Sequence, residues 1–142
     1  MGRKLVIITG PTAVGKTDFC IEAALKYGSP VISCDSRQIY KEMTIGTAVP
    51  DASQLAAVKH YFIHSIHVTE PYSSGQYEID ALTLIDRLFS EGRETLVMCG
   101  GSGFYIDAVC NGLDCLPVPP PELREELTQR VKTEGVGALA EE

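Results

Sequence analysis

The sequence predicts an α/β fold in which helices flank a parallel β-sheet. Short apolar runs rich in β-branched residues alternate along the chain with longer segments of helical periodicity. A glycine-rich segment stands between the first apolar run and the first helical segment. Strands that alternate with helices pair in parallel through right-handed crossovers. Three strands are predicted, which is few for such a fold, so we expect this chain to hold only part of it.

The glycine-rich segment at residues 10–17 reads G-P-T-A-V-G-K-T and fits the phosphate-binding loop (P-loop) pattern G-x-x-x-x-G-K-[ST]. The apolar run at residues 5–9 predicts a buried strand before it. Apolar residues between 19 and 25 predict a helix after it, which ends near Gly28 and Pro30. The amides and the dipole at the start of that helix favour an anion. We therefore predict a P-loop NTPase-like core that binds a di- or triphosphate.

Each part of the loop has a place in this prediction. The glycines allow a tight turn, so that backbone N–H groups surround the phosphate oxygens. Lys16 neutralises phosphate charge, and the hydroxyl of Thr17 is placed to ligate Mg²⁺. The candidate phosphate-binding residues are Gly10, Pro11, Thr12, Ala13, Val14, Gly15, Lys16 and Thr17.

Two further strands and three further helices are predicted after the first helix. The strands lie at residues 31–34 and 95–99, and the helices at residues 77–89, 104–109 and 122–131. A proline-rich connector at residues 117–121 precedes the last helix, which is strongly charged. Tyr72 and Tyr77 are interpreted as partly buried anchors.

Composition limits the function classes. The chain has 142 residues, 12 basic and 19 acidic, and a net charge of −7, which disfavours a nucleic-acid binder unless the contact is local. No apolar run approaches the ~20 residues of a membrane span, and no signal peptide is recognisable. Five scattered cysteines without a C-x-x-C pair indicate reduced, buried thiols that fill the core of a cytoplasmic protein.

Asp35 is the one acidic residue at the end of a predicted strand, where ligands bind in open α/β sheets. A carboxylate there could hold magnesium through water or act as a general base. It could equally cap a helix or close a turn, as an Asp before a Ser often does. His60, His64 and His67 have spacings of four and three, which suit a helix face or an irregular segment, and no metal site is expected there.

Four sequence blocks together resemble the tRNA dimethylallyltransferases, the IPP transferase family. They are the P-loop, S-C-D-S-R-Q-I-Y at residues 33–40, I-G-T-A at residues 45–48 and G-G-S-G-F-Y at residues 100–105. The match continues at residues 72–73 and 111–113 and spans essentially the whole chain. Val49, where the family often has Lys, and Ser102, where many members have Thr, are mild departures. Family members continue further, with a helical tRNA-gripping insertion and another catalytic segment.

The resemblance implies transfer of a dimethylallyl group from dimethylallyl diphosphate to the N6 amine of the adenosine 3′ of the anticodon. The P-loop would then hold the diphosphate with Mg²⁺, and the catalytic residues would be Asp35, Lys16 and Thr17. Asp35 would take the proton of the amine. The residues that match tRNA contacts are Asp35, Ser36, Arg37, Gln38, Ser102 and Arg124.

The resemblance also divides the chain. Residues 1–116 would form a partial P-loop catalytic core, and residues 117–142 a connector and the start of a helical tRNA-binding region. The expected partners are tRNA and dimethylallyl diphosphate, without a membrane, and we expect a monomer. Two alternatives stay open: a small-molecule P-loop kinase or adenylate prenyltransferase, and a non-catalytic phosphate-binding fragment.

Overall fold

The protein is described here from a computed structural model, which describes residues 2–113 and 119–141. Four parallel strands form one sheet in the spatial order β1-β4-β2-β3. The strands are β1 (Lys4–Ile8), β2 (Val31–Ser33), β3 (His60–Tyr61) and β4 (Thr95–Cys99). The prediction of three strands is wrong, because β3 at the sheet edge has two residues and is too short to show an alternating pattern.

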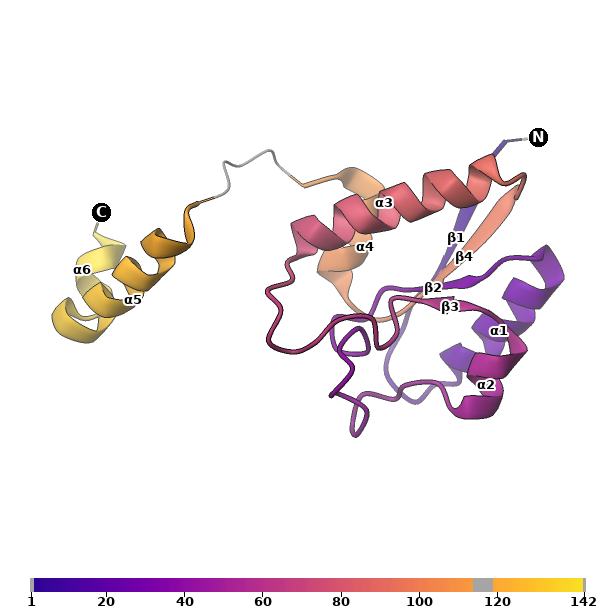
Figure 1. The fold of residues 1–142 in the computed structure, drawn as a ribbon, viewed down its shortest axis with the longest axis horizontal. Helices are drawn as coiled ribbons and strands as arrows, with labels where there is room; N and C mark the ends of the chain where they lie inside the picture. Colours follow the sequence, from indigo (N-terminus) through magenta and orange to yellow (C-terminus); the bar gives the residue numbers. More distant parts are fainter. Residues whose placement is uncertain (1, 114–118, 142) are drawn as a thin grey trace.

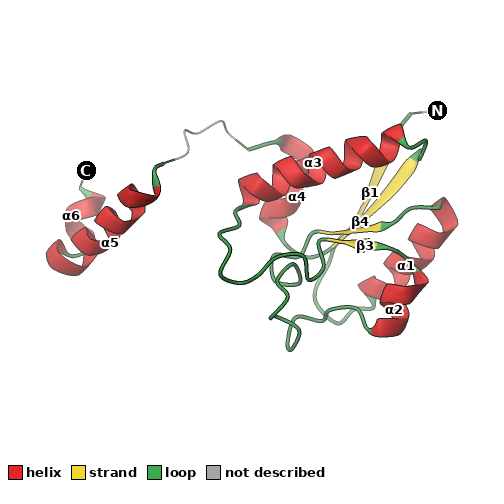
Figure 2. Cartoon of the chain, in the orientation of Figure 1, coloured by secondary structure: helices red, strands yellow, loops and turns green. Residues whose placement is uncertain are grey.

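Helices cover both faces of the sheet (Figures 1 and 2). α1 (Lys16–Tyr27) packs against β4 and β2, and the short α2 (Ala52–Ala57) packs against α1. On the opposite face, α3 (Ser74–Ser90) packs against β4 and against α4 (Gly103–Asn111). The predicted α/β class is therefore confirmed, with α2 and the short helix α6 at residues 136–140 as helices that sequence periodicity did not predict.

The central strands alternate their side chains between two core clusters, as the pleat of a strand requires. On the α3 face, the buried residues include Ile32, Cys34, Leu96 and Met98. On the α1 face, they are Val31 and Val97 with Cys20 and Ala24. Because both faces of β2 and β4 are buried, these strands read as continuous apolar runs in the sequence.

Tyr77 joins the α3 face to the end of β2. It is fully buried, rather than partly buried as predicted, and its hydroxyl donates a hydrogen bond to the carbonyl of Ser33 at 2.8 Å. Its ring stacks on Tyr105 of α4, with 4.0 Å between the ring centroids. Tyr72 is half-buried and donates to the carboxylate of Asp80 at 2.8 Å.

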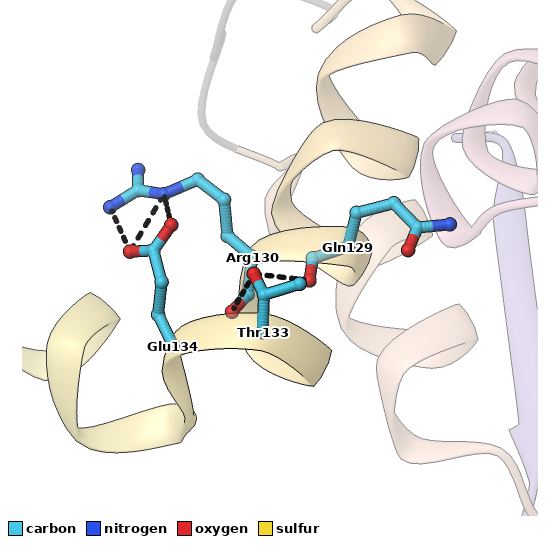
Figure 3. Close-up of polar contacts among 4 residues, drawn as sticks. All are labelled: Gln129, Arg130, Thr133 and Glu134. Carbon is cyan, nitrogen blue, oxygen red and sulfur yellow. Dashed lines mark hydrogen bonds and ion pairs between the residues drawn. The ribbon is translucent and has the colours of Figure 1, made fainter.

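The carboxyl-terminal helices are α5 (Pro121–Glu134) and α6 (Val136–Ala140), which contact each other. They lie away from the sheet in Figure 1. Side chains within α5 support it: Arg130 forms an ion pair with Glu134 at 3.3 Å, and the Thr133 hydroxyl donates to the carbonyl of Gln129 at 3.1 Å (Figure 3). The predicted connector at residues 117–121 lies partly outside the described residues.

Two composition-based predictions can be compared with the fold. Cys20 and Cys34 are buried and Cys99 is half-buried, whereas Cys110 is exposed, so the prediction of buried thiols is wrong for Cys110. Cys115 lies outside the described residues. In the part of the chain that the structure describes, none of the helices combines the length and the apolar character that crossing a bilayer demands.

Candidate functional site

The P-loop connects β1 to α1 and leaves the first amides of the helix without a side-chain partner. Gly15, the N-cap residue, has a φ of 82° in the left-handed region, which glycine adopts without strain. It carries no side chain to cap the helix, so the first N–H groups remain available for a ligand. Lys16 is half-buried and its ammonium donates a hydrogen bond back across the loop to the carbonyl of Pro11. Unpartnered N–H groups and a lysine at the start of a helix form an arrangement that favours an anion.

A cavity of about 260 Å³ opens beside this loop, at the carboxyl ends of the strands. Residues of the P-loop line one side, and Asp35, which follows β2, lines another. Further lining comes from segments that were not predicted to belong to the site, at Thr47, Ala48, Pro50, Gln54, His60 and Ile63. The cavity thus brings the predicted phosphate site and the predicted carboxylate into one space.

Asp35 closes a turn with one oxygen of its carboxylate. Oδ1 accepts hydrogen bonds from the backbone N–H groups of Arg37 at 2.8 Å and Gln38 at 3.2 Å. The turn role that sequence reasoning left open is therefore present in the structure. Within residues 2–113 and 119–141, no hydrogen bond is found to Oδ2, and the residue lines the cavity. A role as a base is compatible with this arrangement, because the turn uses only one of the two oxygens.

Ser36 and Ser102 lie side by side although 66 residues separate them. The backbone N–H of Ser36 donates to Oγ of Ser102 at 2.8 Å, and the Ser102 hydroxyl donates to Oγ of Ser36 at 3.0 Å. Ser102 is the N-cap residue of α4, and both serines line a second, shallower pocket with Tyr40 and Phe104. The structure therefore groups two of the residues predicted from the family resemblance.

Gln38 holds the loop that forms the far wall of the cavity. Its amide Nε2 donates to the carbonyls of Thr47 at 2.9 Å and Ala48 at 3.0 Å. The Thr47 hydroxyl in turn donates to the carbonyl of Met43 at 2.7 Å. With its amide group engaged in the protein, Gln38 positions the wall of the cavity. Arg37, in contrast, is exposed.

Gly100 permits the close approach of β4 to the segment that carries Asp35. A Cβ at this position would lie 2.5 Å from the backbone carbon of Cys34 and 2.6 Å from its oxygen. The N–H of Cys34 donates to the carbonyl of Cys99 at 2.8 Å, and the N–H of Ser102 donates to the carbonyl of Cys34 at 3.1 Å. Only glycine fits this contact without a shift of the backbone.

His60 of β3 lines the cavity and is half-buried. Burial lowers its pKa, and a hydrogen bond between Nδ1 and the carbonyl of Val58 at 2.9 Å partly opposes this effect. His60 is therefore neutral at pH 7, with Nδ1 as the donor and Nε2 as an acceptor.

The three histidines do not share a helix face. His64 contacts the hydroxyl of Thr44 at 3.4 Å, and His67 contacts the carboxylate of Glu42 at 2.6 Å. In the described ranges, no group of three or more His, Cys, Asp or Glu side chains is placed to hold a metal ion.

α2 was not predicted, although its start has a recognisable signal. The side chain of Asp51 accepts a hydrogen bond from the N–H of Gln54, and the Gln54 side chain accepts one from the N–H of Asp51, which is a capping box. Gln54 also donates to the carboxylate of Asp18 in α1 at 2.7 Å. This contact ties α2 to the first turn of α1, beside the P-loop. Among the other unpredicted lining residues, Thr47 and Ala48 belong to the I-G-T-A block at residues 45–48, whereas Pro50, His60 and Ile63 have no comparable local signal.

The donor atoms of the cavity suit Mg²⁺. Magnesium is usually held by one or two protein oxygens, with phosphate oxygens and water completing its coordination. The Thr17 hydroxyl and the Asp35 carboxylate are hard oxygen groups that line the same cavity as Lys16. The residues present therefore fit a magnesium ion that enters with a bound phosphate group.

Arg124 is exposed on α5, which follows the residues that are not described in the order of the chain. Among the predicted site residues it stands apart, because the others belong to the sheet and the loops at its edge.

The sequence and the fold both match known proteins. A family profile described as IPP transferase matches residues 38–142. A protein named tRNA dimethylallyltransferase 2 from Parabacteroides distasonis is 46% identical over 140 residues, covering 99% of this chain and 46% of that protein. One from Porphyromonas gingivalis is 49% identical over 138 residues, covering 96% of this chain and 46% of that protein.

A solved structure agrees with this result. The full-length tRNA isopentenylpyrophosphate transferase from Bacillus halodurans matches with a TM-score of 0.75 and 34% identity, over 98% of this chain and 46% of that chain. The chain belongs to the IPP transferase family. It spans about 46% of the length of the curated relatives it matches.

Proposed function

We propose that this chain binds dimethylallyl diphosphate and takes part in transferring the dimethylallyl group to the N6 amine of the adenosine 3′ of the anticodon in tRNA. One observation supports this proposal above the others: a single cavity is lined by the P-loop and by Asp35. A reaction that releases diphosphate and removes a proton from an amine needs these two kinds of group in one site.

At the donor end, the bond between the allylic carbon and the diphosphate oxygen breaks, and negative charge grows on the diphosphate. Lys16 and the free amides at the start of α1 are placed to stabilise that charge. Magnesium, held by Thr17 and the phosphate oxygens, would add positive charge at the leaving group. These groups would bind the diphosphate and orient its prenyl chain across the cavity.

At the acceptor end, the nitrogen of the adenine forms a bond with the allylic carbon and loses a proton. In the proposal Asp35 accepts this proton, since an exocyclic amine conjugated with a ring is a weak nucleophile. Ser36, Arg37, Gln38, Ser102 and Arg124 are proposed to position the tRNA, Gln38 indirectly through the loop it holds. An unpaired base can be splayed out of an RNA loop and read along its edges.

The acidic balance of the chain bears on the tRNA part of the proposal. A net charge of −7 opposes broad contact with phosphates. We further propose that residues 1–116 supply the catalytic core and residues 117–142 lead into a helical tRNA-binding region. The 142-residue chain should then bind dimethylallyl diphosphate but only weakly bind tRNA. Tight, salt-sensitive tRNA binding in a filter assay would contradict this division.

Two assays separate the proposal from its alternatives. In a competition experiment, dimethylallyl diphosphate should displace a labelled pyrophosphate probe better than ATP; a strong preference for ATP would favour a P-loop kinase. In a transfer assay on the intact protein, the prenyl group should reach unmodified tRNA but not free AMP. Transfer to AMP alone would indicate an adenylate prenyltransferase, and binding without any transfer a non-catalytic phosphate-binding module.

A further inference from the structure

Two cysteines lie together beneath the P-loop, in a place that the proposed reaction does not use. Cys20 lies one helical turn after Lys16 on α1, and Cys99 is the last residue of β4. Both line the cavity beside the loop. Cys20 is 1% exposed and packs in the α1-face cluster, against which Cys99 also packs. Two thiols from distant parts of the sequence therefore share one small space.

The two thiols interact directly. Cys20 forms a side-chain hydrogen bond with Cys99, which lowers the pKa of Cys99 and raises the pKa of Cys20. Burial opposes this effect by raising the pKa of Cys99, as does the charge of Asp35, whereas the positive charge of Lys16 lowers it. A cysteine that is partly accessible and close to a cation carries more thiolate, which is the form that reacts with oxidants. Cys99 is half-buried on the cavity wall whereas Cys20 is 1% exposed, so Cys99 is the member that an oxidant in the cavity reaches first.

The other described cysteines are poorly placed to compete for Cys99. Cys34 belongs to the cluster on the opposite face of the sheet, and burial raises its pKa to about 12. Cys110 is exposed near the end of α4, a helix that packs with α3 on that opposite face. Although the N–H of Cys34 donates to the carbonyl of Cys99, the two side chains belong to clusters on opposite faces of the sheet.

We propose that Cys99 and Cys20 form a peroxide-sensitive pair that closes to a disulfide beside the P-loop. The Cys99 thiolate attacks one oxygen of hydrogen peroxide, the O–O bond breaks, and sulfenic acid and hydroxide form. The Cys20 thiol then attacks the Cys99 sulfur, its proton leaves with the departing hydroxide as water, and the disulfide forms. In total, two thiols and one peroxide give one disulfide and two waters.

The disulfide changes the geometry of the loop. It brings two sulfurs to about 2 Å, closer than hydrogen-bonded thiols can lie, so the first turns of α1 must move toward β4. Lys16 and Thr17 lie on the same turn and move with it. Diphosphate affinity should therefore fall about tenfold, by the sensitivity of such sites to small displacements. This consequence rests on the proposed function, whereas the disulfide itself does not.

The experiment treats the protein with hydrogen peroxide in a Cys110→Ser/Cys115→Ser background. This background retains the pair and Cys34. Peptide mapping should find a Cys20–Cys99 link within one chain, with the mass of two hydrogens lost and reversal by a thiol reductant. Cys20→Ser should instead accumulate sulfenic acid at Cys99, trapped by dimedone. A Cys20→Ala variant, with melting checked by circular dichroism, separates loss of the resolving thiol from misfolding.

Three results would contradict the proposed pair. They are disulfides only between chains, a disulfide that includes Cys34, or sulfenic acid on Cys34 while Cys99 stays reduced. The effect of the disulfide on the loop is tested by measuring the affinity for inorganic pyrophosphate with Mg²⁺ by calorimetry. The reduced protein should bind it, the oxidised protein about tenfold more weakly, and bound pyrophosphate should in return shift the thiol–disulfide equilibrium toward the reduced form by the same factor. If the reduced protein does not bind pyrophosphate, the proposed function fails while the mapped disulfide still stands. Equal affinity in both states would refute the effect on the loop.

Discussion

The two walls of the cavity are held in different ways. The P-loop wall, residues 10–17, is one continuous segment whose shape follows from glycine and the start of a helix. The acceptor wall, residues 34–48, is held by a distant segment, through the contacts of Ser102 with Ser36 and of Gly100 with Cys34, and by Gln38 across its own loop. A wall whose shape is set locally is therefore combined with a wall that forms only when the sheet is assembled. Substitutions in the two walls should fail differently.

The largest effect is expected at the acceptor wall, in catalysis. Asp35→Asn can still accept the two backbone hydrogen bonds that close the turn, but it cannot take a proton. Turnover in the intact protein should fall by about 10²–10⁴-fold, the usual contribution of a general base. Donor affinity, measured by calorimetry, should change little. If affinity collapses while turnover at saturation survives, Asp35 is a magnesium or structural ligand instead.

The next effect concerns the stability of the acceptor wall. Gly100→Ala places a Cβ against the backbone of Cys34, at 2.5 Å, which forces the ends of β2 and β4 apart. We expect the free energy of unfolding to fall by about 3 kcal/mol, as measured by urea titration. Gly103→Ala is the matched control, because a Cβ there meets nothing within 4 Å and the residue begins α4. Equal stability of the two variants would show that the close approach is not required.

A third prediction addresses the P-loop wall. Lys16→Ala should weaken binding of dimethylallyl diphosphate by about 10- to 100-fold, since charged hydrogen bonds contribute about 1.5–3 kcal/mol. The unfolding free energy should change little, because the ammonium donates to the carbonyl of Pro11 in an exposed part of the loop. Lys26→Ala, in the last turn of the same helix, is the control and should leave affinity unchanged. Unaltered affinity in a folded Lys16→Ala protein would refute the donor site.

The smallest effect is expected at His60 of β3, which also lines the cavity. Its folded-state pKa lies below the unfolded value of 6.5, so the unfolded chain binds more protons as the pH falls through that value. The contribution of neutral His60 to the free energy of unfolding is therefore complete above pH 6.5, and it decreases as the solution becomes more acidic. Urea titrations should give a lower free energy of unfolding at pH 5.5 than at pH 7.5. The His60→Gln substitution should make this difference smaller. An identical pH dependence in both proteins would contradict the role of burial.

Local sequence determined the P-loop wall by itself. The strand, the glycine turn and the helix are encoded within residues 4–27, where each signal is read from neighbouring residues. The same holds for β4, α3 and α5, whose apolar or charged periodicity predicted them within a few residues. Asp35 was identified from its place after a strand, because parallel strands present their carboxyl ends at one edge.

Only the tertiary structure decided the rest. β3 is a strand because β2 is its neighbour, since two residues carry no pattern of their own. The need for glycine at position 100, the pairing of Ser36 with Ser102 and the contact of Cys20 with Cys99 all join residues more than 60 positions apart. Such contacts depend on the order of strands in the sheet and on which face each side chain meets. The sequence pattern of a strand shows which of its residues alternate between the two faces. It does not show which strand lies beside it or which residues it will pack against.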